Sequence, residues 1–508
     1  MKNPDTIYIV NFGGQYCHLL ARRVREQNVY SEIVSPEAIP EELPTNVKGI
    51  ILSGGPSSVY CENAPQISSK LLYKGIPILG LCYGHQLIAH HLGGKIKRSN
   101  KMEYGVAEVT IKKPVGLLKG LKKSIKVWMS HGDSVVSLPK DFEILAHTKN
   151  CPVAAFKHKT YKLYGLQWHP EVVHTEYGDK MLSNFIFAIS NCKPNWKLED
   201  FITRSVNELK AEIGNRKAIL AISGGIDSSV AGALGAKALG NNLTTVFVDH
   251  GFMRKDEAEE VAKVIKKLKV NFIKVNAEDR FLSAVKGVVD PEKKRKIIGE
   301  QFIRVFEEEA KKVNADYLLQ GTIYPDRIES GSSQNSAVIK THHNVGGIPL
   351  NVKFKKIVEP LKELYKDEVR RVGKKLNLPP FIINRQPFPG PGLAVRIIGD
   401  ITKERLELLR EADAIVRYEL DRSKLKLWQY FAVLTNTYTT GVKGDSRAYG
   451  YTIAIRAVDS REAMTAKFVD IPYEILERMS TRITNELTGV NRVVYDITHK
   501  PPATIEWE

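Results

Sequence analysis

Short apolar runs alternate with helical patterns along the N-terminal part of the chain. Apolar runs of this length, set between polar or glycine-rich segments, predict buried strands, and the periodic stretches between them predict helices. The predicted strands are 7–10, 49–52, 76–81 and 163–168. The predicted helices are 15–27, 64–74 and 83–92. This alternation indicates a mostly parallel sheet with helices on both faces.

A second alternation of the same kind follows a polar stretch at 191–195. Its predicted strands are 218–222, 245–248 and 272–275, and its predicted helices begin near 227 and at 256. The second of these helices is expected over 256–268, because apolar residues recur there at the spacing of one helix face: Val261, Val264, Ile265 and Leu268.

A stretch rich in proline and glycine, 385–392, excludes a helix or a central strand and marks another boundary. Beyond it we expect a helix at 402–420 and strands at 449–457 and 491–497. The predicted fold class is therefore α/β, with two doubly wound, mostly parallel-sheet domains followed by a smaller α+β domain. The predicted domains are 1–193, 194–384 and 385–508.

The overall composition is that of a globular protein with several cores. Roughly three domains are expected for 508 residues, of which 43% are hydrophobic and 26% charged. The chain has no apolar run of the roughly 20 residues needed to cross a bilayer, and no signal-like N-terminus, so we expect a cytoplasmic protein without a membrane partner. Five cysteines without a CxxC pair predict neither a disulfide framework nor a zinc cluster.

The net charge of +18 leaves two interpretations open. It is compatible with nucleic-acid binding, and equally with a lysine-rich surface on a protein whose ligands are anions. Basic residues occur in short runs such as 293–296 and not in a long tail. We favour the second interpretation and expect no nucleic-acid partner.

One cysteine stands in a pattern that predicts chemistry. Cys82 lies in the motif Gly-Leu-Cys-Tyr-Gly, between an apolar strand and a helix. Small residues two positions before and after it allow the sharp turn of a nucleophile elbow. The helix N-terminus then favours the thiolate, and the Tyr83 amide points into an oxyanion site. A buried cysteine that is merely a small apolar side chain is the ordinary alternative, and it suits Cys17 and Cys151.

A thiol nucleophile needs a base and a group that orients the base. His169 and Glu171 supply both at the end of the predicted strand 163–168. A Ser-Gly-Gly-Pro loop at 53–56 ends another strand of the same sheet, and the Gly55 amide is our candidate for the second oxyanion donor.

Cys82, His169, Glu171 and the 53–56 loop resemble a class I glutamine amidotransferase domain, over residues 6 to 190. The resemblance implies that the cysteine attacks the side-chain amide of glutamine and releases ammonia through a thioester. It also implies that Gln86 and Asp133 bind the substrate glutamine. A turn aspartate is the ordinary alternative for Asp133, which lies in the segment 128–133.

A second chemical site is predicted after the strand 218–222. Glycine amides, serine hydroxyls and the following helix N-terminus form a cradle for an anion. A carboxylate there repels phosphate unless it faces a metal, so Asp227 suggests Mg²⁺ bound with ATP. The cradle residues are Ser223, Gly224, Gly225, Ile226, Asp227, Ser228 and Ser229.

This loop lacks the Gly-Lys-Ser/Thr of the Walker pattern and resembles the PP-loop of the N-type ATP pyrophosphatases. Those enzymes adenylate an acceptor and release pyrophosphate, so the resemblance indicates the reaction type and leaves the acceptor open. It places adenine beside Val248. Lys366 is a candidate pyrophosphate contact, although a surface helix would show the same pattern.

The order of the two modules, and further segments, resemble the glutamine-hydrolysing GMP synthase family over essentially the whole chain. These segments are 248–254, 320–326, 340–344, 387–396 and 500–508. The resemblance implies that XMP is adenylated and that ammonia displaces AMP to give GMP, with glutamine, ATP and XMP as substrates and a homodimer built through the C-terminal domain. Its implied XMP-binding residues are Arg254, Gln429, Asp445, Lys500 and Glu506.

Two other hypotheses remain open at this point. A PP-loop enzyme that modifies tRNA would suit the basic charge, but it would leave Cys82, His169 and Glu171 without a role. A catalytically inactive nucleotide-binding protein would be expected to have lost a nucleophile or a cradle residue, and each of these is present.

Overall fold

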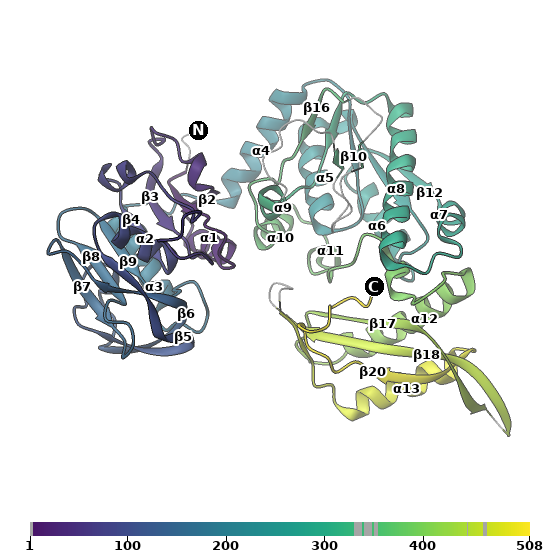
Figure 1. The fold of residues 1–508 in the computed structure, drawn as a ribbon. Coiled ribbons are helices and arrows are strands. Elements are labelled where there is room, and N and C mark those ends of the chain that lie inside the picture. The colour runs from purple at the N-terminus through teal and green to yellow at the C-terminus, as the bar shows by residue number, and fades with distance from the viewer. Residues whose placement is uncertain (1–3, 330–337, 340–347, 350–353, 444, 461–464) are drawn as a thin grey trace. The chain divides into compact units, whose positions relative to one another are not determined.

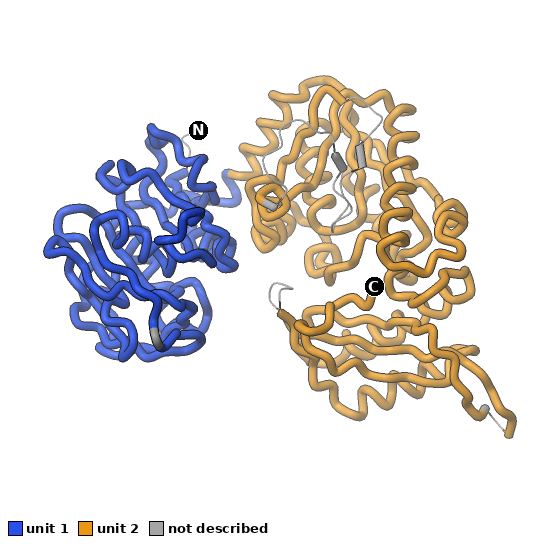
Figure 2. Tube along the Cα trace, viewed as in Figure 1, with its two compact units in different colours: residues 1–200 blue, residues 201–508 orange. Residues whose placement is uncertain are grey.

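In the computed structural model the chain forms two compact units, residues 1–200 and 201–508 (Figure 1, Figure 2). The structure describes residues 4–329, 338–339, 348–349, 354–443, 445–460 and 465–508. The segment 340–344, which contributed to the family resemblance, lies outside the described residues. The predicted division into three domains stays a prediction.

Unit 1 contains a nine-stranded sheet that is parallel in one half and antiparallel in the other. In spatial order its strands are β2 (Tyr30–Val34), β1 (Thr6–Val10), β3 (Val47–Leu52), β4 (Ile78–Leu81), β9 (Leu163–Leu166), β8 (Ala155–His158), β7 (Phe142–His147), β5 (Lys95–Ile111) and β6 (Ser124–Ser137). The last four pairings, from β9 to β6, are antiparallel. The sheet therefore combines a doubly wound half, which ends at β9, with an antiparallel extension.

The helices of unit 1 are α1 (Cys17–Glu26), α2 (Tyr83–His91) and α3 (Gly178–Ser183), which continues into a π-helical turn at Asn184–Ile189. The predicted helix at 64–74 is wrong: only a short 3-10 helix forms, Ser69–Tyr73. Pro65 disfavours helical geometry in the residue before it, and Gly75 follows soon after. The edge strand β2 was not predicted, because only alternate residues of an edge strand need to be apolar.

Unit 2 begins with a five-stranded parallel sheet. Its order is β12 (Asn271–Asn276), β11 (Leu243–Asp249), β10 (Ala218–Ala221), β13 (Tyr317–Leu319) and β16 (Lys356–Val358). The accompanying helices are α4 (Leu198–Ile213), α5 (Ile226–Leu239), α6 (Glu257–Lys266), α7 (Glu278–Val285), α8 (Pro291–Val313), α9 (Tyr324–Glu329), α10 (Lys366–Lys375) and α11 (Pro380–Ile383). A two-stranded ribbon pairs β14 (Val338–Ile339) with β15 (Ile348–Pro349).

The C-terminal part of unit 2 is the expected α+β region. Its sheet contains β17 (Gln429–Lys443), β18 (Ser446–Asp459), β19 (Lys467–Phe468) and β20 (Val490–Tyr495), and its helices are α12 (Lys403–Asp421) and α13 (Tyr473–Glu486). Figure 1 shows the long β17–β18 hairpin extending beyond the helices. The predicted fold class, two mostly parallel sheets followed by an α+β region, is confirmed.

One apolar core runs through both parts of unit 2. It includes Val246 of β11, Phe306 of α8, Leu406 of α12 and Ile453 of β18. Helix α8 also corrects a sequence interpretation: Lys294, in the basic run 293–296, is fully buried and not a surface lysine. Among the helices of the described residues, none combines the length and apolar character needed to span a bilayer.

Candidate active sites

Cys82 occupies a strained turn between β4 and α2. Its backbone has φ 50° and ψ −103°, which a residue with a side chain rarely adopts. The turn is closed by two glycines. A Cβ on Gly80 would lie 2.3 Å from the Gly84 carbonyl oxygen, and a Cβ on Gly84 would lie 2.4 Å from the Leu52 carbonyl oxygen. The motif therefore builds the elbow through close backbone contacts that only glycine permits.

His169 lies beside the elbow and is oriented by Glu171. The His169 Nδ1 atom is 2.7 Å from the Glu171 carboxylate, and both side chains are buried. Burial by itself lowers the pKa of His169, but the Glu171 carboxylate and the Cys82 sulfur together raise it well above its usual value. A Cβ on Gly54 would touch both His169 and Cys82, at 3.0 and 3.7 Å, so the 53–56 loop closes over this pair.

The residues whose amides are the predicted oxyanion donors, Tyr83 and Gly55, lie beside Cys82. Tyr83 begins α2, directly after Cys82, and Gly55 packs against the Tyr83 ring, where a Cβ would lie 3.4 Å from Cγ. The Cys82 thiol donates to the Ser130 carbonyl oxygen of β6 at 3.5 Å. The structure thus brings the predicted nucleophile, base, orienting carboxylate and backbone amides together from three separate segments: 82–83, 169–171 and the 53–56 loop.

Asp133 and Gln86, the predicted glutamine-binding residues, are both buried and linked to each other. The Gln86 amide donates to the Asp133 main-chain oxygen at 2.8 Å and to Gln167 Oε1 at 3.2 Å. The Asp133 carboxylate accepts from the Ser58 hydroxyl at 2.5 Å and from the Tyr60 hydroxyl at 3.1 Å. Ser58 and Tyr60 were missed by the sequence analysis, and their only signal is that they follow the 53–56 loop.

The predicted anion cradle forms in unit 2 between β10 and α5. Gly224 has φ +75°, and the Ser223 and Ser228 hydroxyls lie 3.2 Å apart across the loop. The Gly225 amide donates to Ser223 Oγ at 3.4 Å, and the Ser229 amide begins the helical hydrogen bonding to Gly225. The remaining cradle residue, Ile226, is buried at the first turn of α5. A left-handed glycine followed by a helix N-terminus is the geometry of a backbone anion site.

Asp227 is buried in this cradle and forms an ion pair with Lys366. Its second carboxylate oxygen, Oδ1, has no hydrogen-bond partner among the described residues. Lys366 comes from the first turn of α10, far along the chain, so the structure brings these two predicted ATP-binding residues together. Val248 is buried in β11, the neighbour of the strand that leads into the cradle.

Arg385 was not predicted as a site residue, yet it borders the cradle. Its guanidinium donates to the Ser223 carbonyl oxygen at 3.4 Å and pairs with Glu257 at 2.7 Å. In the sequence it lies at the start of the proline-rich stretch 385–392, whose composition indicated only a boundary.

A second group of buried charges surrounds Phe388. The guanidinium carbons of Arg254, Arg396 and Arg385 lie 4.4, 5.2 and 5.6 Å from the centre of its ring. Arg254 Nε is 3.5 Å from the Asp413 carboxylate. Arg396, Phe388 and Asp413 were missed as site residues. A charged residue at the end of the apolar run 393–395 was the signal for Arg396.

Of the predicted XMP-binding residues, Gln429 and Glu506 are in direct contact. The Gln429 amide donates to Glu506 Oε1 at 2.8 Å, and Arg396 holds the same carboxylate with two bonds of 2.7 and 2.9 Å. Lys500 is half-buried, and its main chain pairs with Ala466.

Asp445 is not brought to this group within the chain. It is exposed at the turn between β17 and β18, whereas Gln429 begins β17. At about 3.3 Å per residue, the two ends of this strand are more than about 40 Å apart. Its predicted contact with XMP therefore stays a prediction that this chain alone does not support.

Two chemical modules are thus present: a cysteine elbow with a buried histidine–glutamate pair, and an anion cradle with a buried carboxylate. They define a glutamine amidotransferase joined to a PP-loop ATP-utilising enzyme. Family models agree: "Glutamine amidotransferase class-I" matches residues 8–189, "NAD synthase" matches 196–304, and "GMP synthase C terminal domain" matches 418–507.

The chain belongs to the glutamine-hydrolysing GMP synthase family. It is 55% identical to the GMP synthase of Caldicellulosiruptor saccharolyticus, over 99% of each chain. It is 53% identical to that of Clostridium botulinum strain Kyoto over 100% of each chain, and 52% identical to that of Clostridium tetani over 99% of each. These full-length matches do not favour a tRNA-modifying enzyme or an inactive nucleotide-binding protein.

Proposed function

We propose that this protein makes GMP from XMP, with ATP as the activating substrate and glutamine as the nitrogen donor. The observation that carries the proposal is that both chemical modules, each with assembled side chains, occur in a chain that matches GMP synthases over its full length. Unit 1 then supplies ammonia and unit 2 consumes it.

In unit 1, the Cys82 thiolate attacks the side-chain amide carbon of glutamine, and the Gly55 and Tyr83 amides hold the resulting oxyanion. His169 gives its proton to the amide nitrogen, which leaves as ammonia. A thioester remains on Cys82, and water hydrolyses it to release glutamate. Glu171 keeps the ring oriented and stabilises its protonated form, as the raised pKa of His169 supports. Gln86 and Asp133 hold the substrate.

In unit 2, the XMP base oxygen attacks the α-phosphorus of ATP, pyrophosphate leaves, and ammonia then displaces AMP. Ser223, Gly224, Gly225, Ser228 and Ser229 would hold the phosphates, with Lys366 at pyrophosphate and Val248 beside adenine.

Asp227 fits a Mg²⁺ ion, because a buried carboxylate oxygen without a partner among the described residues faces an anion cradle. When bound, the ion would neutralise phosphate charge. For XMP we propose Arg254, Gln429, Lys500 and Glu506, with Arg396 holding Glu506 in place.

We also propose a homodimer formed through the β17–β18 hairpin. Large apolar side chains are exposed along it, namely Tyr438, Val442 and Tyr449, at 60%, 74% and 59%. Light scattering on the purified protein tests this proposal, and a monomer at micromolar concentration would refute it. The cytoplasmic location expected from the sequence stays a prediction.

The decisive assay supplies ATP, Mg²⁺, XMP and either glutamine or ammonium, and follows GMP and pyrophosphate. The wild type should form both products with either nitrogen source. Cys82→Ala should lose glutamine-dependent synthesis and keep ammonia-dependent synthesis. Cys61→Ser, which changes an exposed cysteine of the same unit, is the matched control and should keep both. Absence of XMP-dependent pyrophosphate release would overturn the proposal.

A further inference from the structure

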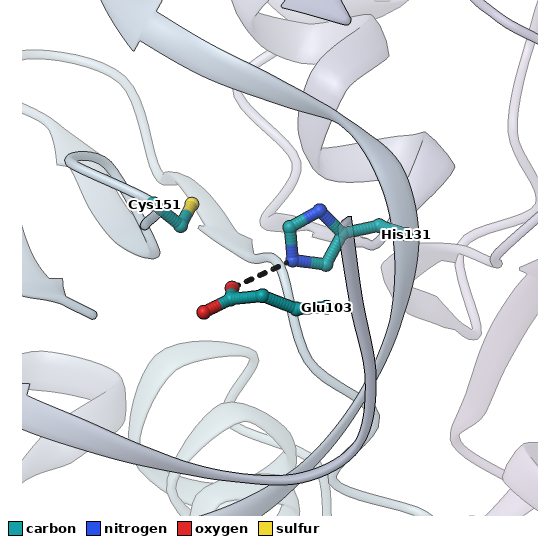
Figure 3. A group of neighbouring side chains, drawn as sticks. All are labelled: Glu103, His131 and Cys151. Atoms are coloured by element: carbon teal, nitrogen blue, oxygen red, sulfur yellow. Dashed lines mark hydrogen bonds and ion pairs between the residues drawn. The ribbon is translucent and has the colours of Figure 1, made fainter. Parts of the chain in front are cut away.

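A buried cysteine, histidine and glutamate lie close together in unit 1 (Figure 3), and the histidine contacts the main chain of Asp133. Glu103 of β5 and His131 of β6 are direct cross-strand neighbours, and Cys151 comes from the loop after β7. One ligand-type atom from each lies within 4.8 Å of the others. The group resembles a metal site in composition, so the hydrogen bonds of the histidine ring decide its nature.

Both nitrogens of the His131 ring face acceptors. Nδ1 is 2.9 Å from the Asp133 main-chain oxygen, and Nε2 is 3.0 Å from the Glu103 carboxylate. The Ser134 hydroxyl also lies 3.5 Å from Nδ1. Both ring nitrogens are therefore engaged by protein groups, and the ring bridges the Glu103 carboxylate and the Asp133 main chain. We interpret the Glu103–His131 contact as a buried hydrogen-bonded pair.

The surroundings agree with this assignment. Burial raises the pKa of Glu103, but its bonds to the His131 ring and the Thr148 hydroxyl bring that pKa below its usual value. Burial, and secondly the electrostatic influence of His131, lower the pKa of His85 to about 3. Thr148 Oγ1 donates to the other Glu103 oxygen at 2.8 Å and accepts from the Cys151 amide at 2.8 Å. The carboxylate is thus fixed from both sides.

The strand that carries His131 contacts the proposed catalytic groups through its main chain. The Trp128 carbonyl accepts from the His169 amide at 3.1 Å, and the Ser130 carbonyl accepts from the Cys82 thiol at 3.5 Å. The Asp133 carbonyl accepts from Gln86 at 2.8 Å and from His131 itself. A shift of this strand would therefore move three groups together. They are His169, the Ser130 carbonyl that binds the Cys82 thiol, and the Asp133 carboxylate that we propose binds the substrate.

We propose that the hydrogen-bonded Glu103–His131 pair positions the glutamine-binding strand: it fixes residues 128–133 so that the Asp133 carboxylate meets the substrate. The inference rests on the proposed glutaminase function of unit 1. Neither Glu103 nor His131 touches the reacting atoms. Both act through Asp133, whose main-chain oxygen lies 2.9 Å from His131 Nδ1.

The test is the steady-state kinetics of glutamine hydrolysis by the full-length protein with ATP and XMP present. Glu103→Gln keeps the size of the side chain and removes its charge, so the His131 ring loses the charged partner of its Nε2 bond. We expect KM for glutamine to rise about 10- to 100-fold, as for loss of a hydrogen bond to a charged group. Glu103→Asp retains the charge and should show a smaller rise. Ammonia-dependent synthesis should not change.

The KM readout separates positioning from simple loss of structure. Partial unfolding of unit 1 reduces the number of active molecules, which lowers kcat and leaves KM unchanged. Glu143→Gln is the control: it removes a surface carboxylate of unit 1 that pairs with Lys113 and Lys157, and KM should stay that of the wild type.

The inference is overturned if KM stays within about two-fold of the wild type in Glu103→Gln, a change smaller than any hydrogen bond to a charge would give. It is also overturned if both Glu103 variants lack measurable glutaminase, because the pair would then be needed for the fold itself. A wild type without glutaminase activity would instead refute the proposed function, so the two failures are distinguishable.

Discussion

The glycine at position 80 offers a test of how the elbow works. In Gly80→Ala, the added Cβ would lie 2.3 Å from the Gly84 oxygen, 2.4 Å from the Gly84 carbonyl carbon and 2.6 Å from the His85 nitrogen. All three are backbone atoms in the first turn of α2. No flexible side chain is part of this contact, so none can rotate away to relieve it.

The size of the effect follows from these distances. To reach a separation of 3.0 Å, the new methyl group and the Gly84 oxygen must move apart by about 0.7 Å. The first turn of α2 then shifts relative to β4, and the Tyr83 amide and the Cys82 sulfur shift with it. A displacement near 1 Å at a reacting group costs about 100-fold in rate, and overpacking of this kind costs about 1–3 kcal/mol of stability.

The assay compares glutamine-dependent and ammonia-dependent GMP synthesis in the same preparation. We expect kcat/KM for glutamine to fall about 100-fold, while the ammonia-dependent rate is unchanged because it needs only unit 2. Gly232→Ala in α5 is the matched control, since its Cβ would meet the ends of flexible side chains: Ile222, Leu220 and Leu268, at 3.2, 3.4 and 3.6 Å. It should leave both rates unchanged. Gly80→Ala with wild-type glutamine use would refute the steric argument, and an equal fall in both rates would show that the effect is not local.

Three further predictions test other contacts. The raised pKa of His169 means that its pairing with Glu171 stabilises unit 1 fully below about pH 6.5 and progressively less as pH rises through the raised value. The difference in melting temperature between wild type and Glu171→Gln should therefore shrink toward alkaline pH, and a constant difference would contradict this. Asp227→Asn should abolish XMP-dependent pyrophosphate release but preserve glutamine hydrolysis, and unchanged release would exclude its metal role. Lys294→Met leaves the Glu508 carboxylate, 2.5 Å away in the wild type, buried and unpaired. Chemical denaturation should show unit 2 less stable by about 3–5 kcal/mol, and unchanged stability would show that the pair contributes nothing.

The catalytic elbow and the anion cradle were predictable because each is a local structure. In both, a strand, a few glycines and a helix N-terminus lie within ten residues, and the backbone conformation follows from the residue types. Cys82 and Asp227 could therefore be identified without any knowledge of distant contacts. Helices α6 and α12 were predictable for a similar reason, since apolar residues recur along one face of each.

The sequence by itself determined the two chemistries of this protein, because nucleophile and cradle are built by neighbours along the chain. Only the tertiary structure decided what surrounds them. Glu103 and His131 meet because the register of β5 and β6, which shifts just before Glu103, sets them opposite each other. Arg396 reaches Glu506 because the segment around Ile505 packs against β17 and β18. Lys294 carries the same charge as any surface lysine, and nothing in its neighbours marks it as buried. These side-chain contacts depend on strand register and helix packing. Both are determined by interactions between residues far apart in the sequence.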